Sequence, residues 1–558
     1  MLPDVTLRPA EIMRAGAACW RRWLPAALWA LAAVAGFTVY LRLARTRAAN
    51  SDGASQALQA WDLLHGNLLM HGWTTTDVAL YTTEIPEYLL VELARGLSQG
   101  VVHVAAAITY TLVVLFAAAL ARGTATGREA ALRITITVGI MLAPQLASGT
   151  NVLLSSPDHI GTSVPIMLAW LILDRAPRRW WAAVAATVIL SWSVIGDQLV
   201  LVAAILPLIG VCAVRAAREL RRRQRSAASA AQAANGARGR GSWRTGGWDG
   251  LRYEAALAAG GVVAAVAGVV APHVMRAIGG YDVPPVASSL SPLRTIAHVT
   301  VPVTGEGFLL LGGAYFPGLH GAQAWFAVLH LAGVALAAWG VGVTAGRFFR
   351  GESLLPQLLL AGIAVNVASY ALGTHALNLP TTREMAPVLP FAAALAGWQL
   401  PRLLTAAKPG RLVVLPVLGL VLAGYVAGLA LEFTAPAVSA QNARLASWLV
   451  RHHFGDGLSG YWEANVVTLT SGGRVGIRAL DVKDGRVIRH VANSRSDWFD
   501  PAVSTADYVV LNQSVNSGYG GFTDRTAVIA TFGQPAHVYH VGPYTILQWR
   551  RNLLADLR

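Results

Sequence analysis

The chain has 558 residues, of which 54% are hydrophobic and only 13% are charged, whereas about a quarter of the residues in an ordinary soluble domain are charged. This composition excludes a soluble globular protein. The formal net charge of +15 does not indicate a nucleic acid partner, because the basic residues fall in clusters between apolar runs and not on one solvated face.

Apolar runs of roughly the length that crosses a membrane recur from Leu24 to Leu431 and then stop. They predict a mainly α-helical, polytopic transmembrane bundle, and an odd number of runs places the two chain ends on opposite sides. The third to sixth runs are short and closely spaced, so broken or re-entrant helices are an alternative there. The eleven runs lie near residues 24–41, 101–121, 134–150, 159–173, 180–196, 198–214, 253–271, 322–345, 354–371, 384–400 and 411–431.

The basic residues predict the orientation. More than half of the 44 Lys and Arg residues lie before the first run or in the loops on that same side. Arg42, Arg45 and Arg47 oppose this bias, but the summed excess decides the orientation. By the positive-inside rule we expect an integral plasma-membrane protein with a cytoplasmic N-terminus and an exported, extracellular or periplasmic, C-terminal domain.

Three segments interrupt the transmembrane module, residues 1–431. The first outer loop, residues 42–100, is long, and within it Ser55–Leu64 predicts an amphipathic helix in the membrane interface. The cytoplasmic loop 215–252 is basic and has the composition of a disordered linker. Pro272–Gly321 is rich in Pro, Gly and Ser, which predicts an irregular outer segment.

Residues 432–558 have a different pattern, with Gly-Asp turns and short β-type runs after a helical stretch at Ala440–Phe454. They predict a small exported α/β domain. The expected strands are Val466–Thr470, Val475–Ala479, Tyr508–Leu511, Val538–His540 and Tyr544–Trp549.

The strongest candidate for chemistry is Asp52, just beyond the first run. A carboxylate at a partly desolvated membrane edge can act as a general base, and the alternative is a loop aspartate that caps the helix beginning near Ser55. The adjacent pair Asp158 and His159 could bind a phosphate or a metal, or Asp158 could simply begin a helix.

Two further charged residues stand at the ends of apolar runs. Asp197 follows the fifth run, and ionisable groups at apolar depth are candidates for function by default. The planar guanidinium of Arg383 suits a phosphate, although pairing with Glu384 or snorkelling explains it equally well. The first outer loop adds carboxylates and aromatic residues, each of which could also be an ordinary structural contact, namely Asp62, Glu84, Trp61 and Trp73.

Nucleotide-binding loops, dinucleotide fingerprints and zinc spacings are absent from the sequence. With Asp52 after the first run, the sequence resembles the C-type (GT-C) superfamily of integral-membrane glycosyltransferases, which use polyprenyl-phosphate sugars. The resemblance also rests on the loop Ala60-Trp61-Asp62-Leu63-Leu64-His65-Gly66-Asn67, the turn Asp158-His159-Ile160-Gly161-Thr162, Arg383 before Pro387 and Pro390, and the segment Gly460-Tyr461-Trp462-Glu463-Ala464-Asn465.

The resemblance implies a sugar transferase whose first outer loop carries the catalytic base, here Asp52. Arg383 and His159 would stabilise the donor phosphate, and Trp61 and Trp73 would stack on sugar. The supporting or acceptor-binding residues would be Asp62, Glu84, Asp158 and Asp197. Many members have a second acidic residue beside the base, where this chain has Gly53, so a divalent metal is left open.

The implied partners are the lipid bilayer, a polyprenyl-phosphate sugar and a cell-envelope acceptor, either a cell-wall polysaccharide or a glycolipid. A transporter or flippase of lipid-linked or anionic substrates is the alternative, and a non-catalytic scaffold is a third hypothesis. The transporter predicts charges spread towards the bilayer midplane, whereas the transferase predicts that the key charges gather on one face.

Overall fold

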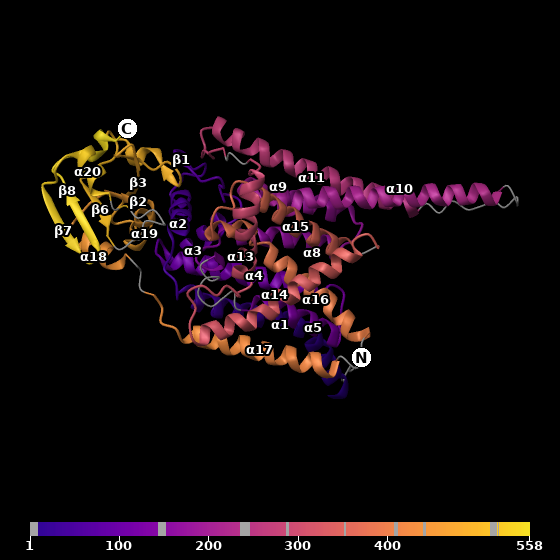
Figure 1. Ribbon diagram of the computed structural model, residues 1–558. Helices are drawn as coiled ribbons and strands as arrows, with labels where there is room; N and C mark the ends of the chain where they lie inside the picture. The colour runs from indigo at the N-terminus through magenta and orange to yellow at the C-terminus, as the bar shows by residue number, and fades with distance from the viewer. Residues whose placement is uncertain are drawn as a thin grey trace, which may run out of the picture.

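The computed structural model describes residues 9–142, 152–234, 246–285, 289–350, 353–406, 411–438, 442–513, 522 and 524–557. Figure 1 shows a helical bundle with a sheet at one end and one long helix, α10, projecting at the other, while α11 lies along the bundle. The predicted class, a mainly α-helical membrane protein with C-terminal strands, is confirmed.

Within the described residues, seven helices are long and apolar enough to cross a membrane. Five of them coincide closely with predicted runs, and α10 is preceded without a break by the short π-helix η1 (Leu201–Ile205). The seven are α1 (Pro9–Ala44), α4 (Gly100–Arg122), α10 (Leu206–Ala234), α11 (Gly246–Ala277), α14 (Ala322–Arg347), α15 (Leu354–Leu372) and α17 (Arg411–Thr434).

Four shorter helices account for the remaining predicted runs, although the end of the third run, residues 143–150, lies outside the described residues. The last of them is almost entirely buried from Val388 to Leu400, because α4, α5, α14 and α15 surround it. It therefore forms the centre of the bundle. The four are α5 (Gly127–Met141), α8 (Ser163–Arg175), α9 (Trp180–Gly196) and α16 (Val388–Ala406).

The first outer loop contains two helices, α2 (Ser51–Leu64) and α3 (Ile85–Arg95). The prediction that the first of these lies in the membrane interface is wrong, because nearly all of Ser51–Ala60 is buried against protein. The second exposes Leu90 and Leu93, each 66% accessible, and so has the apolar face of an interfacial helix.

The segment Pro272–Gly321 is more helical than predicted. The helix α11 continues to Ala277 through Pro272, and after an extended stretch the chain forms α12 (Leu293–Thr295), η2 (Ile296–Thr300) and α13 (Val301–Leu311) without interruption. Pro302 stands in the first turn of α13, directly after the π-helix η2.

The prediction of a disordered basic loop over 215–252 is also wrong for most of its length. α10 runs on to Ala234 and α11 begins at Gly246, while 235–245 lie outside the described residues. Ala and Arg are strong helix formers, so this composition favours helix continuation more than a flexible linker.

The C-terminal part forms a six-stranded mixed sheet in the order β4-β3-β2-β6-β8-β7. β2 pairs in parallel with β3 and β6, and the outer pairings are antiparallel. Helices α18 (Ala443–Arg451), α19 (Tyr461–Thr470) and α20 (Arg525–Phe532) accompany it. The strands are β2 (Gly457–Gly460), β3 (Ile477–Lys483), β4 (Arg486–Arg489), β6 (Tyr508–Asn512), β7 (His537–Val541) and β8 (Tyr544–Gln548).

Val466–Thr470, predicted as a strand, belongs to helix α19. Most of that helix is buried, packed between α2 and β3, and such an all-apolar run does not distinguish a helix from a strand. A two-stranded pairing of β1 (Trp73–Thr74) with β5 (Ser494–Arg495) also joins the first outer loop to the C-terminal part. The sheet is thus held directly against the loop that carries Asp52.

Candidate active site

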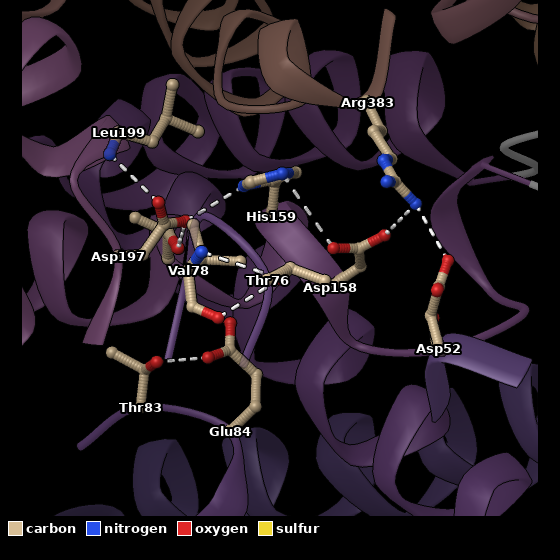
Figure 2. Close-up of polar contacts among 12 residues, drawn as sticks. Asp52, Thr76, Val78, Thr83, Glu84, Asp158, His159, Asp197, Leu199 and Arg383 are labelled. Atoms are coloured by element: carbon tan, nitrogen blue, oxygen red, sulfur yellow. Dashed lines mark hydrogen bonds and ion pairs between the residues drawn. The ribbon is translucent and has the colours of Figure 1, made fainter. Parts of the chain in front are cut away.

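Asp52 is the second residue of α2, so the helix start fixes its position. The cap of this helix is Asn50, whose Oδ1 accepts a hydrogen bond of 2.8 Å from the backbone N–H of Gly53. The capping role considered for Asp52 is therefore filled by its neighbour. The Asp52 carboxylate instead points towards Arg383 and Asp158 (Figure 2).

Arg383 comes from a short 3₁₀-helix, η3 (Leu379–Met385), between α15 and α16. Its Nη1 donates to Asp52 Oδ2 at 2.9 Å and to Asp158 Oδ2 at 3.0 Å. The Asp158 carboxylate, the strongest influence, raises the pKa of Arg383 together with Asp52, against the effect of burial. Arg383 therefore does not pair with Glu384, as the sequence also allowed. It bridges the carboxylates of Asp52 and Asp158, which are 106 residues apart in sequence.

His159 and Asp197 form a second, more deeply buried pair. His159 Nδ1 lies 3.0 Å from Asp197 Oδ2, and the same carboxylate accepts from Thr162 Oγ1 at 2.5 Å and from the Leu199 N–H at 2.8 Å. Burial alone would lower the pKa of His159, but Asp197 and Asp158 raise it to about 10. Burial alone would raise the pKa of Asp197. The charge of His159 and the hydrogen bonds to the carboxylate outweigh burial and lower this pKa. At neutral pH the ring is an imidazolium.

Asp158 connects the two pairs, because its Oδ1 lies 3.9 Å from His159 Nε2 while its Oδ2 binds Arg383. It begins α7 (Asp158–Gly161) with a φ of +37°, a left-handed backbone conformation that is unfavourable for a residue with a side chain. Such strain is concentrated at functional sites, where the surrounding structure holds it in place. The resulting cluster has three carboxyl groups, those of Asp52, Asp158 and Asp197, around two cations.

Two glycines allow the elements of the cluster to approach closely. A Cβ at Gly53 would lie 2.7 Å from Val102 Cγ1 and 3.0 Å from Ser156 Cβ. A side chain such as the second acidic residue of the resemblance described above therefore has no room at position 53. A Cβ at Gly161 would lie within 3.0 Å of the Glu84 side chain.

Glu84 lies against α7 and is 1% exposed. Its Oε2 accepts a hydrogen bond from Thr83, and no partner is found for Oε1 among the described residues. Burial, the largest influence, raises the pKa of Glu84 well above its ordinary value. Burial therefore favours the neutral, protonated form of Glu84 beside the cluster.

Asp62 and the two predicted aromatic residues are not part of the cluster. Asp62 is ten residues after Asp52 on the same helix, about 15 Å along its axis. It accepts hydrogen bonds from Trp73 Nε1 at 2.8 Å and from Arg495 Nη1 at 2.8 Å. Trp73 is only 2% exposed, so it stabilises the loop and cannot stack on a sugar. Trp61 packs against the ring of His65.

Tyr461, which the sequence did not single out as a site residue, completes the environment of Asp52. Its hydroxyl donates to Asp52 Oδ1 at 2.5 Å and accepts from Asn493 Nδ2 at 2.9 Å. Its backbone carbonyl accepts a hydrogen bond from Ser51 Oγ at 2.5 Å. Tyr461 belongs to the segment 460–465, which is part of the resemblance described above. No other feature of the sequence pointed to Tyr461 as a site residue.

Two cavities meet at α7. A polar cavity of about 230 Å³ borders His159 and Asp197 and is also lined by Asp77, His375 and Glu384. A larger, mainly apolar cleft of about 650 Å³ borders Glu84 and Gly161 and runs between α3, α4, α8 and α9. The four residues of α7 therefore separate the polar cavity from the apolar cleft.

The described ranges contain no group of three or more His, Cys, Asp or Glu side chains placed to hold a metal ion. The groups of the cluster bind one another instead. Both Asp52 oxygens accept hydrogen bonds from protein donors, and His159 Nδ1 lies 3.0 Å from the Asp197 carboxylate.

Two solved structures of ArnT have a similar fold. ArnT from Cupriavidus metallidurans, in a crystal structure bound to undecaprenyl phosphate, aligns over 94% of this chain and 98% of that chain at 12% sequence identity, with a TM-score of 0.53. The apo crystal structure of the same ArnT aligns over 96% and 99% at 12% identity, with a TM-score of 0.52. Neither a protein-family model nor a curated protein sequence matches the chain.

Proposed function

We propose that this protein transfers a sugar from a polyprenyl-phosphate donor to a cell-envelope acceptor, a polysaccharide or a glycolipid. The observation that carries the proposal is the bridge from Arg383 to Asp52 and Asp158, which puts a phosphate-binding cation beside a candidate base. The charged residues gather in one cluster, which the transferase hypothesis predicts and a transporter with a charged path does not.

The donor would bind across α7. The apolar cleft suits a polyprenyl chain, and burial raises the pKa of Glu87 on its wall to about 8, so this carboxyl is neutral there. The phosphate would lie near Arg383 and the His159 imidazolium. Both bonds from Arg383 leave from Nη1, and its side chain is 40% exposed, so Nη2 and Nε can turn to a ligand. ArnT, with the same fold, binds undecaprenyl phosphate.

In the transfer step an acceptor hydroxyl attacks the anomeric carbon of the sugar, and the bond from that carbon to the phosphate oxygen breaks. Asp52 takes the hydroxyl proton, and the polyprenyl phosphate leaves with its charge stabilised by Arg383. Hydrogen bonds from Tyr461 and Arg383 hold the carboxylate in place, and it retains further lone pairs for the incoming proton.

The direct test is transfer of labelled sugar by the purified, full-length protein from a polyprenyl-phosphate donor to cell-envelope acceptors. We expect label in the acceptor and release of polyprenyl phosphate in equal amounts. Movement of intact donor across vesicle membranes, without cleavage, would instead identify a flippase and contradict the proposal.

The orientation is part of this proposal, with residues 432–558 as an exported domain. Because the clusters of arginine predict a cytoplasmic N-terminus, a reporter that functions only outside the cytoplasm should be active when fused after Arg558. The matched control carries the same reporter in the basic segment 235–245, where it should be inactive. The reverse pattern would overturn the orientation and the placement of the site at the exported face.

A further inference from the structure

A second pair of adjoining cavities lies far from the Asp52 cluster. Arg179 immediately precedes α9 and Asp197 immediately follows it, so the two ends of this helix are about 25 Å apart. At the Arg179 end, a basic cavity of about 670 Å³ lies between α10, the start of α11 and Phe349. A groove of about 640 Å³ between α9 and α11 adjoins it, and Arg178 lines both.

The arginine side chains that line the basic cavity outnumber the carboxylates that line it. Arg215 is bound to Glu254 at 2.7 Å and to Gln357 at 2.9 Å, and Arg218 stacks over the ring of Phe349 at 4.9 Å. Five more arginines line the cavity with exposed side chains, against two glutamates. They are Arg178, Arg221, Arg222, Arg225 and Arg350.

The adjoining groove is basic only at the end that it shares with the basic cavity. Arg179 and Arg252 stand there with Trp180 and Tyr253, the aromatic types that prefer the boundary between water and lipid. Along α9 the wall continues as Val184 and Val188, which are 52% and 61% exposed. The arginines at one end of the groove match the charged headgroup of a phospholipid. The aromatic residues beside them and the apolar wall beyond match its interface region and its acyl chains.

We propose that this place binds an acidic glycerophospholipid. Its phosphate would lie among Arg178, Arg252 and the arginines of α10, and one acyl chain would lie in the groove between α9 and α11. Charge complementarity favours an acidic over a zwitterionic headgroup, and the apolar groove favours a lipid over a soluble phosphate. The site is independent of the proposed transferase activity, because it lies at the opposite end of α9 from the cluster.

The test compares phosphatidylglycerol with phosphatidylcholine of the same acyl chains, each added to the full-length protein in neutral detergent. Native mass spectrometry gives the fraction of protein with lipid bound. We expect preferential binding of phosphatidylglycerol, and an apparent Kd about 30-fold weaker for the Arg178→Gln/Arg252→Gln variant, because two cations are lost. The matched control, Arg122→Gln/Arg128→Gln, changes the last residue of α4 and the second residue of α5 and should bind like the unsubstituted protein.

Two further measurements separate the sources of phosphate. sn-Glycerol 3-phosphate and inorganic phosphate should compete weakly with phosphatidylglycerol, and Val184→Asn/Val188→Asn should weaken lipid binding without changing phosphate binding. Equal binding of the two lipids, or an unchanged Kd in the Arg178→Gln/Arg252→Gln variant, would overturn the proposal. Competition by inorganic phosphate as strong as by the lipid would also overturn it and would identify a site for a free anion.

Discussion

Replacing Asp52 by asparagine is expected to lower kcat for sugar transfer by about 10²–10⁴, the usual contribution of a positioned general base. Asn keeps the size of the side chain and can still accept the hydrogen bond from Tyr461, while Asn50 continues to cap the helix. The fold should therefore survive. The measurement is turnover by purified protein whose thermal unfolding midpoint matches that of the unsubstituted chain.

Two variants serve as controls for this experiment. Asp62→Asn is on the same helix but about 15 Å from Asp52, and should retain most of the activity. Tyr461→Phe removes only one donor to the Asp52 carboxylate, so we expect a smaller loss of about tenfold. If the Asp52→Asn protein transfers sugar at a near-normal rate, the base is another residue, and Asp158 and Asp197 become the first candidates.

Changing Arg383 to lysine should raise the donor KM and lower kcat/KM about tenfold to a hundredfold, about the value of one charge-assisted hydrogen bond. The charge is conserved, but lysine has a single ammonium group and loses the planar fork with which Arg383 can hold two carboxylates and a phosphate together. The measurement is initial rate against concentration of the polyprenyl-phosphate donor at saturating acceptor.

Arg276→Lys is the matched control, since Arg276 pairs with Asp282 and is 57% exposed, where an ion pair contributes little. It should change neither KM nor kcat. Unchanged donor kinetics in the Arg383→Lys protein would remove Arg383 from the phosphate site. A purely structural role would appear as a lower thermal unfolding midpoint with kinetics of the folded fraction unaltered.

The sequence predicted the helical bundle well because membrane helices are specified by local composition: a run of apolar residues is enough to place α4 or α14. It predicted less where tertiary contacts decide. The apolar run of α19 reads equally as strand or helix, and α2 is buried because α3, α4 and α19 pack against it. The arginine-rich end of α10 is helical because its residues favour helix, although its composition is that of a linker.

Five of the predicted site residues lie together in one cluster, namely Asp52, Asp158, His159, Asp197 and Arg383. Charged residues at the ends of apolar runs were informative because they are costly at membrane depth and need partners. Aromatic residues carry no such signal, since a tryptophan packs in a core as well as on a sugar, as Trp73 does. Tyr461 could not be found for another reason: its partner is 409 residues away, and no local pattern encodes that contact.

The hydrogen bond between Tyr461 and Asp52 also determines when the site is complete during synthesis. Asp52 emerges early, at the end of the first membrane helix, whereas Tyr461 is made only after the whole bundle. Until α19 has docked on α2, the Asp52 carboxylate lacks the hydrogen bond from Tyr461 and has only Arg383 as a donor. The last step in forming this cluster is therefore the folding of the C-terminal part onto the first loop, and not the insertion of the helices.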